Sequence, residues 1–194
     1  MKKVATIIAV VFAVTFASNS FAQATDSEMI TITANLNTTL ALTLDNSAIT
    51  FDFNTLDDYN NGLGGFESDY ASEGSVSSTS NWKLGFKADD VFSHEDGSTT
   101  MPLDNLGVTV DFTGSNDIDN LADGSAKSLE SSESVILEHD GSNSNAGNDN
   151  ANSFIIYWEM GTQDGDMNSE SIFEQDLKKG TYTVDVEFIL TEVL

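Results

Sequence analysis

The stretch Gly180-Thr-Tyr-Thr-Val-Asp-Val-Glu-Phe-Ile-Leu-Thr-Glu-Val-Leu194 decides the fold class of this chain. Every second side chain in it is apolar and falls on one face of an extended chain: Tyr182, Val184, Val186, Phe188 and Leu190. Threonine and acidic side chains fall on the opposite face, which is the pattern of a β-strand with one buried side. Full burial of such a row contributes about 8–15 kcal/mol before entropy is counted, as much as the net stability of a domain. The stretch therefore predicts one long, half-buried β-strand that needs a partner sheet.

The same alternation recurs upstream of this stretch. It is present in residues 30–44, 49–53, 76–88, 106–112, 135–137 and 154–160. Segments rich in Gly, Ser, Asn and Asp separate these runs and predict turns and loops, with residues 54–70 as a surface loop. Only residues 169–179 could hold a helical turn. About seven to nine strands with long polar loops predict an all-β chain folded as one β-sandwich.

The first residues have the pattern of an export signal. Lys2 and Lys3 precede an apolar run over residues 4–17, and Ser20-Phe21-Ala22 supplies the small residues that a signal peptidase reads. We therefore expect residues 1–22 to be a cleaved signal peptide and residues 23–194 to form a single exported domain, extracellular or on the cell surface. We expect no transmembrane segment after signal cleavage, because the later apolar runs are too short.

The composition excludes several classes of function. The chain has 7 basic residues, all lysines, against 32 Asp and Glu, and loss of Lys2 and Lys3 with the signal peptide leaves a net charge of −27. Such a surface repels nucleic acid and anionic membrane, so we expect no nucleic-acid partner. The charge favours solubility, and divalent cations are the alternative explanation for it. Because the chain has no cysteine, disulfides, thiol catalysis and cysteine–zinc sites are excluded.

Residues 30–44 alternate for too long to form one ordinary strand. At about 3.3 Å per residue they would span roughly 50 Å, whereas a typical strand has about five or six residues. Either the strand breaks near Asn37-Thr38-Thr39 and folds into its own sheet, or its first half leaves the domain. In the second case residues 23–36 are an exchanged N-terminal strand, and its inserted face consists of Ile30, Ile32, Ala34 and Leu36. Residues 40–44 and 49–53, joined by Asp45-Asn46-Ser47, predict a hairpin.

Several motifs resemble those of known surface proteins. Asp176-Leu177-Lys178-Lys179-Gly180-Thr181-Tyr182 resembles the D-L-x-x-G-x-Y corner of immunoglobulin-like and pilin-like sandwiches, in which the tyrosine hydroxyl ties the late strand to the preceding corner. The early I-T-I-T-A segment, residues 30–34, and the closing G-T-Y-T-V-D-V-E-F segment resemble cysteine-free fimbrial subunits of the chaperone–usher type. Asn81-Trp82-Lys83-Leu84 is similar to the W-x-L of bacterial surface domains, although the second such run, Trp158-Glu159-Met160, is not at the C-terminus. The resemblance implies a pilin-like fold with Tyr182 and Gly180 at a structural corner, a surface or fibre subunit, and a secretion chaperone as a further partner.

The candidate sites in the loops are weak. Asp164, Asp166, Asn168 and Glu170 offer oxygen ligands at alternate positions, as a calcium loop does, but Ser169 and Gln175 stand where an EF-hand needs Gly and Glu. We therefore expect no cofactor, with calcium as the alternative. A similar, weaker acidic group consists of Asp117, Asp119 and Asp123. In the acidic loop, three aromatic residues form a candidate glycan or partner surface: Tyr59, Phe66 and Tyr70.

The chain also lacks the sequence signs of an enzyme. It has neither a G-x-S-x-G elbow nor an H-E-x-x-H motif, and both His94 and His139 lie in polar segments where we expect solvated side chains. We therefore expect no enzymatic activity. Two functions remain: a structural subunit of an extracellular bacterial filament or coat that assembles with copies of itself by β-strand addition, or a monomeric extracellular binding module for glycan or calcium.

Overall fold

The computed structural model describes residues 29–194, so the predicted signal peptide, residues 1–22, lies outside the described residues. The described elements, with η for a 3-10 helix, are β1 (Leu40–Leu44), α2 (Leu56–Asn61), β2 (Leu63–Gly64), β3 (Ala71–Ser78), β4 (Trp82–Ala88), β5 (Phe92–His94), β6 (Thr100–Met101), η1 (Leu103–Asn105), β7 (Leu106–Phe112), β8 (Ile118–Asn120), β9 (Lys127–Ser128), β10 (Ser134–His139), η2 (Asp149–Asn152), β11 (Ser153–Met160), β12 (Tyr182–Thr183) and β13 (Val186–Glu192). No helix within this range is long and apolar enough to cross a membrane.

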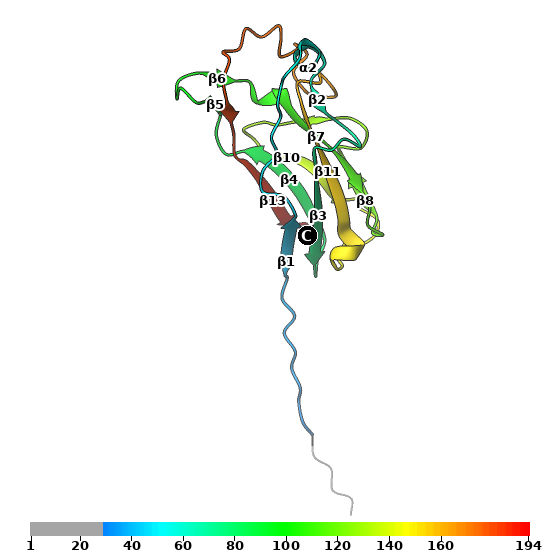
Figure 1. Cartoon of the computed structure of the whole chain (residues 1–194). Coiled ribbons are helices and arrows are strands. Elements are labelled where there is room, and N and C mark those ends of the chain that lie inside the picture. Colours follow the sequence, from blue (N-terminus) through cyan, green and yellow to red (C-terminus); the bar gives the residue numbers. More distant parts are fainter. Residues whose placement is uncertain (1–28) are drawn as a thin grey trace, which may run out of the picture. The chain divides into compact units, whose positions relative to one another are not determined.

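The strands form an all-β sandwich, as the sequence predicts (Figure 1). One sheet has the order β1-β3-β11-β7-β9, with β2 beside β11, and the second has the order β13-β4-β10-β8. A small third sheet has the order β12-β5-β6. Every strand pair found among residues 29–194 is antiparallel.

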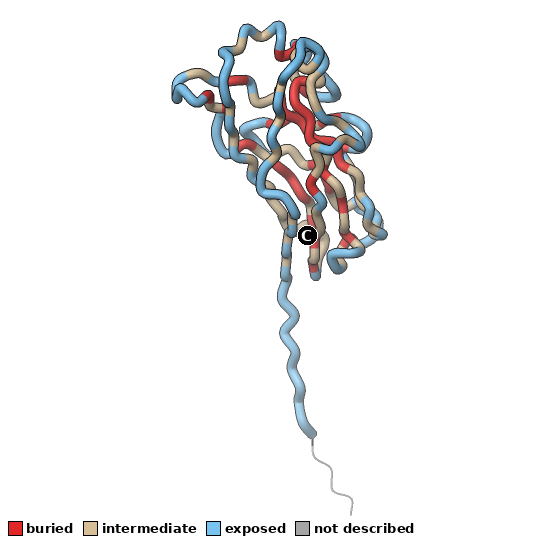
Figure 2. The backbone as a smooth tube through the Cα atoms, viewed as in Figure 1, coloured by how far each residue is buried: buried red, intermediate tan, exposed pale blue. Residues whose placement is uncertain are grey.

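The hydrophobic core lies between the two large sheets, where alternate side chains of their strands meet. β4 contributes Trp82, Leu84 and Phe86, all fully buried, and β11 contributes Phe154 and Ile156 from the facing sheet. Figure 2 shows the buried backbone concentrated in these central strands. Two edge strands, β1 and β13, end the two sheets on the same side of the sandwich, and they lie beside each other.

The strand registers define two ends of the sandwich. At one end, which we call the Leu40 end, β1 begins opposite the last residue of β3, Ser78, and β13 ends opposite the first residue of β4, Trp82. At the other end, the α2 end, β11 finishes beside β2, which directly follows α2. Figure 1 shows α2 and the Leu40 end at opposite ends of the domain. β13 therefore runs from the α2 end to the Leu40 end.

The prediction that residues 54–70 are only a loop was wrong, because they contain the short helix α2. Thr55 caps its first turn: the Thr55 hydroxyl accepts a hydrogen bond from the Asp58 backbone N–H at 3.2 Å, and the Asp58 carboxylate accepts one from the Thr55 N–H at 2.8 Å. This reciprocal pair satisfies backbone donors that a helix start otherwise leaves free. The segment 169–179, by contrast, forms turns and no helix.

Two strand predictions also need correction. Gly180–Leu194 is not one strand, because Tyr182 and Thr183 pair with β5 whereas Val186–Glu192 pairs with β4. The predicted hairpin is absent from the described chain: β1 forms over residues 40–44, but residues 49–53 join no strand. At the expected turn, the Asp45 backbone N–H donates to the Glu73 carbonyl, and the Asp45 carboxylate accepts from the Glu73 N–H at 2.8 Å. These bonds hold the turn to β3, so the chain does not fold back along β1.

Candidate functional site

Residues 29–39 carry no regular secondary structure, and β1 begins at Leu40. Only the second half of the long alternating run forms a strand, β1, and its first half joins no sheet among the described residues. The alternative in which both halves fold into the domain's own sheet was therefore wrong. The apolar positions Ile30, Ile32 and Leu36 are between 86% and 95% exposed, and Ala34 between them is exposed too. All four residues of the predicted inserted face are thus exposed.

The outer edge of β13 is an unpaired strand edge. Among residues 29–194, β13 pairs with β4 alone. Hydrogen bonds run from the Asp89 N–H to the Asp185 carbonyl and from the Val193 N–H to the Asn81 carbonyl, so the odd-numbered residues of β13 bond to β4. By the alternation of an antiparallel ladder, the backbone groups of the even-numbered residues point to the free side. These are Val186, Phe188, Leu190 and Glu192.

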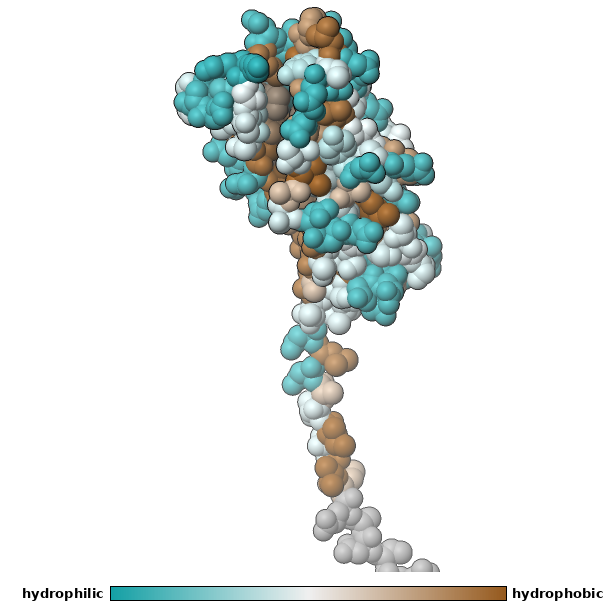
Figure 3. Space-filling model, viewed as in Figure 1, coloured by the Kyte–Doolittle hydropathy of each residue, from teal (hydrophilic) through white to brown (hydrophobic). Residues whose placement is uncertain are grey.

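The sandwich is incompletely closed beside this edge. The core-facing side chains of β13, Val186, Phe188 and Leu190, are only half-buried, whereas those of its neighbour β4 are fully buried. The segment that follows β1 has the same character: Ile49, Phe51 and Phe53 are half-buried against the core and alternate with exposed side chains. Figure 3 shows hydrophobic surface between hydrophilic patches on this face. An added strand could cover these side chains.

The backbone of that segment is also unpaired. Within the described range, the N–H and C=O groups of residues 47–51 make no hydrogen bond, although the side chains alternate as in a strand. Phe51 stacks on Tyr70 with ring centroids 4.6 Å apart, and Phe53 packs on Tyr59 at 5.3 Å. These contacts hold the segment in place through its side chains. Sequence reasoning missed this feature because alternation reports which face is buried and says nothing of backbone pairing.

The corner at the start of the closing strand is firmly held. The Tyr182 hydroxyl donates to the Lys178 carbonyl at 2.9 Å, which is the contact that the resemblance implies for this tyrosine. Gly180 has a φ of 148°, and a Cβ at this position would lie 2.1 Å from Nε2 of His94, so only glycine fits. The expectation of a solvated His94 was wrong: its side chain is buried, edge-on to the Tyr182 ring at 4.9 Å.

Both ring nitrogens of His94 have hydrogen-bond partners in this corner. Its Nδ1 accepts from the Asp96 N–H at 3.1 Å, and its Nε2 lies 3.2 Å from the Lys179 carbonyl, to which it donates. The Asp96 carboxylate in turn accepts from Nζ of Lys178 at 2.7 Å, and this bond is the largest cause of a pKa well below the usual range of an aspartate. These hydrogen bonds therefore determine where β13 begins, and His94 has a structural role in the corner.

Three of the four predicted calcium ligands have separate partners. Asp164 accepts from the Ala126 N–H at 3.0 Å, Asp166 pairs with Nζ of Lys127 at 2.8 Å, and Asn168 accepts from the Glu170 N–H at 3.0 Å. Asp117 accepts from Asn143 at 2.6 Å, in a different loop. In the part of the chain that the structure describes, no three acidic or histidine side chains gather as a metal-binding group.

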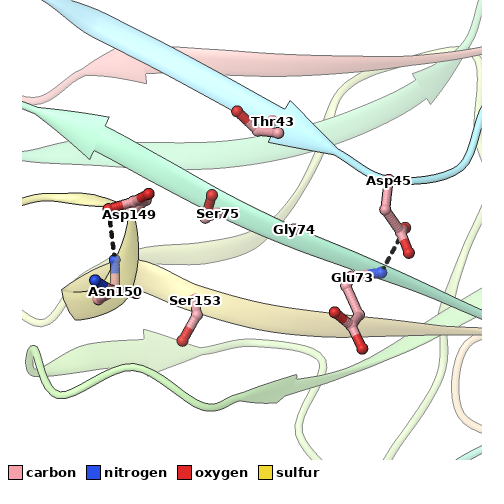
Figure 4. A pocket seen from close by; sticks show the side chains of 8 residues that line it. All are labelled: Thr43, Asp45, Glu73, Gly74, Ser75, Asp149, Asn150 and Ser153. Atoms are coloured by element: carbon pink, nitrogen blue, oxygen red, sulfur yellow. Dashed lines mark hydrogen bonds between the residues drawn. The ribbon is translucent and has the colours of Figure 1, made fainter.

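A shallow hollow of about 280 Å³ lies over the outer face of β1, β3 and β11. Figure 4 shows three carboxylates at its rim, those of Asp45, Glu73 and Asp149. Asp45 is bonded to the Glu73 N–H, and Asp149 accepts from the Asn150 N–H at 3.0 Å, so two of the three are already engaged with backbone. The hollow presents no nucleophile paired with a base.

The aromatic residues that form the candidate glycan surface are not gathered on one surface. Tyr70 and Tyr59 pack on Phe51 and Phe53, and both are half-buried. Phe66 instead lies edge-on to Tyr157 of β11, with ring centroids 5.1 Å apart. These contacts anchor the loop over residues 54–70.

One buried acid stands out among the described residues. Glu159 of β11 is 2% exposed; one of its carboxylate oxygens accepts from the Thr162 hydroxyl at 2.6 Å, and the other has no partner. Burial raises the pKa of Glu159, the nearby negative charge of Asp164 raises it further, and the Thr162 hydrogen bond partly offsets both. Sequence reasoning missed this buried acid, because Glu159 falls where alternation predicts an outward side chain.

The sequence matches no protein-family model, and no curated protein sequence matches it. The site must therefore be interpreted from its own geometry. That geometry combines an exposed apolar row in an unpaired N-terminal segment with an unpaired strand edge at the side of the sandwich.

Proposed function

We propose that this protein is a structural subunit of an extracellular filament or surface coat, and that its copies join by β-strand addition. In this proposal, residues 30–36 of one copy add to the free edge of β13 in the next copy. The observation that carries the proposal is a pair of complementary features among the described residues: a strand-like segment without a sheet, and a sheet edge with which no strand pairs.

The two features match in size and chemistry. Residues 30–36 and β13 each contain seven residues, so an added strand would pair along the whole edge. The apolar face of the segment, Ile30, Ile32, Ala34 and Leu36, would cover the half-buried side chains of β13 and of residues 49–53. An exposed apolar strand and an open edge are otherwise an aggregation hazard in a secreted protein. Strand addition between copies removes both hazards at once.

A deletion tests this proposal. Chains that lack residues 23–36 should be secreted and folded, because the core of the sandwich lies in Leu36–Leu194, but should remain monomeric. Size-exclusion chromatography and electron microscopy of protein from culture supernatant measure this. Intact filaments after the deletion would disprove strand addition by this segment.

Substitutions on the two faces of the segment give a matched control. Ile30→Asp with Ile32→Asp places two charges on the apolar face and should abolish assembly, because a buried unpaired charge is costly. Thr31→Asp with Thr33→Asp adds the same charge to the opposite face and should leave much more assembly. Equal effects of the two pairs would mean that face-specific insertion does not occur.

No observation favours the binding-module alternative as strongly. Three of the four candidate calcium ligands are engaged by backbone or lysine, and the candidate glycan-binding aromatics pack against the domain itself. A rise in the thermal midpoint with millimolar calcium, at constant ionic strength, would support the binding-module alternative.

A further inference from the structure

The spacer between the added strand and the domain is short. If residues 30–36 pair with a neighbouring copy, as the proposed function requires, only Asn37, Thr38 and Thr39 separate them from β1. Three residues span at most about 11 Å. The Leu40 end of the donating domain must therefore touch the accepting domain.

The direction of the added strand decides which end of the accepting domain is touched. All strand pairs in the described domain are antiparallel, and antiparallel pairs are slightly more stable per residue than parallel ones. An antiparallel strand on β13 runs from the Leu40 end of the acceptor to its α2 end, so Leu36 emerges at the α2 end. The Leu40 end of one copy then meets the α2 end of the next. Such a head-to-tail contact can repeat from copy to copy and gives an open filament when its rotation does not close into a ring, whereas a parallel strand would bring two Leu40 ends together.

Much of the Leu40 end consists of residues without charge, and carboxylates lie only at its border. Glu192 accepts a hydrogen bond from the Thr38 hydroxyl at 2.8 Å, Asp140 accepts one from the Ser142 N–H at 2.8 Å, and Asp117 accepts one from the Asn143 side chain at 2.6 Å. Residues 37–39, 77–81 and 141–148 contain only Ala, Asn, Gly, Ser and Thr, in a chain with 32 acidic residues. We call these residues the uncharged end. Hydrogen bonds hold them together: the Thr79 N–H donates to the Thr39 carbonyl at 3.1 Å, and the Ser144 hydroxyl donates to the Asn81 amide oxygen at 2.8 Å.

The uncharged end rests on a buried polar clamp. Asn145 is fully buried, and its amide bonds both the N–H and the C=O of Trp82, at 3.0 and 2.9 Å. Indole Nε1 of Trp82 also donates to the Asn145 carbonyl at 2.9 Å. The loop over residues 141–148 is thus fixed to the first residue of β4. A hollow of about 360 Å³ opens on this surface, and its lining is uncharged: Thr39, Ala41, Ser77, Ser78, Thr79, Gly147 and Asn148.

The α2 end offers complementary apolar side chains. Leu56, the first residue of α2, is 69% exposed, and Phe173 is 59% exposed. The Phe173 N–H donates to the Tyr59 carbonyl at 3.0 Å, which holds this phenylalanine against the helix. Figure 3 shows hydrophobic surface at this end of the domain. An acidic residue follows each of them in the chain, Asp57 after Leu56 and Glu174 after Phe173. An acidic surface approaches an uncharged one without the like-charge repulsion that two acidic surfaces would meet.

The geometry points to a second contact between copies, in addition to the added strand: the α2 end of the accepting copy, with Leu56 and Phe173, packs on the uncharged end of the donating copy. This contact depends on the proposed strand addition. Together, the added strand and the end contact would join the copies into a head-to-tail filament. Charged residues are depleted at the centres of protein interfaces, as they are in the uncharged end.

Cross-linking of single-cysteine variants tests the contact, because the full chain has no native cysteine. Phe173→Cys marks the α2 end and Ser142→Cys marks the uncharged end, and both positions are exposed. A short bis-maleimide added to filaments grown from a mixture of the two variants should give mixed dimers. Each variant alone should give almost none. Dimers from Ser142→Cys alone would show that two Leu40 ends meet, and would overturn the head-to-tail contact.

A charge substitution tests the same contact without cross-linker. Asn148 caps η2 through its side-chain oxygen, and both Asp and Ser can replace that oxygen. Asn148→Asp should raise the critical concentration for assembly about fivefold to tenfold at low salt, because it places a charge opposite an acidic surface. Asn148→Ser should match the wild type. Phe173→Asp should weaken assembly similarly, whereas Leu121→Asp, an exposed apolar position in another loop, should not.

The outcomes separate the two proposals. Strand addition itself is reported by cysteines on the outward faces of the two strands: Asn35→Cys should cross-link to Glu187→Cys in an antiparallel pair, and to Thr191→Cys in a parallel pair. Cross-linking of residue 35 to residue 187 without any link between residues 142 and 173 would keep strand addition and overturn the end contact. Absence of both strand cross-links would overturn the proposed function and the end contact with it.

Discussion

At Tyr182, one hydroxyl joins the closing strand to the loop before it. Tyr182→Phe removes the hydrogen bond to the Lys178 carbonyl but keeps the ring beside His94. The free energy of unfolding should fall by about 0.5–1.5 kcal/mol, the usual net value of one hydrogen bond. Urea unfolding with an unchanged m-value measures this loss.

The control for this change is Tyr157→Phe. Tyr157 packs on Phe66, and its hydroxyl has no hydrogen bond to the described residues. Removal of the Tyr157 hydroxyl should change the free energy of unfolding by less than about 0.5 kcal/mol. Equal losses from the two substitutions would mean that the Tyr182 hydroxyl contributes nothing specific to the corner.

Glu159 predicts a pH dependence of stability. Because burial and Asp164 raise the pKa of Glu159 in the folded chain above its ordinary value of 4.5, the folded state holds the proton more tightly than the unfolded state does. The resulting stability is fully present below pH 4.5 and is lost as the pH rises through the folded pKa. Glu159→Gln, which cannot ionise, should therefore raise the thermal midpoint at pH 7.

The advantage of the Gln variant should shrink as the pH falls toward 4, where the wild-type side chain is protonated in both states. Glu73→Gln, at an exposed position, serves as the control and should leave the midpoint nearly unchanged at each pH. A Gln variant of Glu159 that is less stable than the wild type at pH 7 would contradict the burial argument, and would point instead to a specific role for the charged carboxylate.

At the scale of elements, the free edge of β13 should accept a strand supplied in trans. A synthetic peptide with the sequence of residues 29–37 should bind the domain that lacks residues 23–36, and a ligand of the native state alone raises its stability. At about 100 times its dissociation constant the peptide should raise the thermal midpoint by roughly 5–10 °C. Differential scanning fluorimetry measures this shift. A peptide with aspartate at positions 30, 32 and 36 is the control, and an equal shift from it would contradict insertion of the apolar row.

Elements were predictable from the sequence where one face of a strand is buried. The runs over residues 106–112 and 154–160 became β7 and β11, because period-two alternation follows directly from strand geometry. The same pattern over residues 49–53 gave half-buried side chains but no strand, since backbone pairing depends on what lies beside the chain. Asp45 accepts a hydrogen bond from the Glu73 N–H of β3, and this contact keeps residues 49–53 from folding back along β1.

The candidate site was predictable only in part, for the same reason. The apolar row of residues 30–36 is visible in the sequence, whereas its partner, the free edge of β13, exists only once the order of the strands is known. His94 shows the same limit at the level of a residue. Its neighbours in sequence are polar, but pairing of β5 with β12 buries it beneath Tyr182. Pairing between strands that are distant in sequence cannot be predicted from a short stretch of residues.

At the scale of the whole molecule, assembly has to overcome charge. The full chain carries a formal net charge of −25, and end-to-end stacking in the proposed filament would bring these charges within the screening distance of one another. That distance is about 30 Å at 0.01 M salt and about 8 Å at 0.15 M. In the proposed contact the uncharged end would reduce repulsion, but the rest of each acidic surface would still repel its neighbours.

Assembly should therefore be promoted by salt. Raising sodium chloride from about 0.01 M to about 0.15 M should lower the critical concentration, because screening shortens the range of the repulsion between copies. Sedimentation of filaments across a salt series measures this. Calcium at matched ionic strength should have an effect only modestly larger than sodium, since the acidic side chains of residues 29–194 do not gather as a metal-binding group. A strict requirement for calcium would show that a specific cation joins the copies, and filaments that weaken with added salt would show that attraction between charges, not apolar strand addition, holds the copies together.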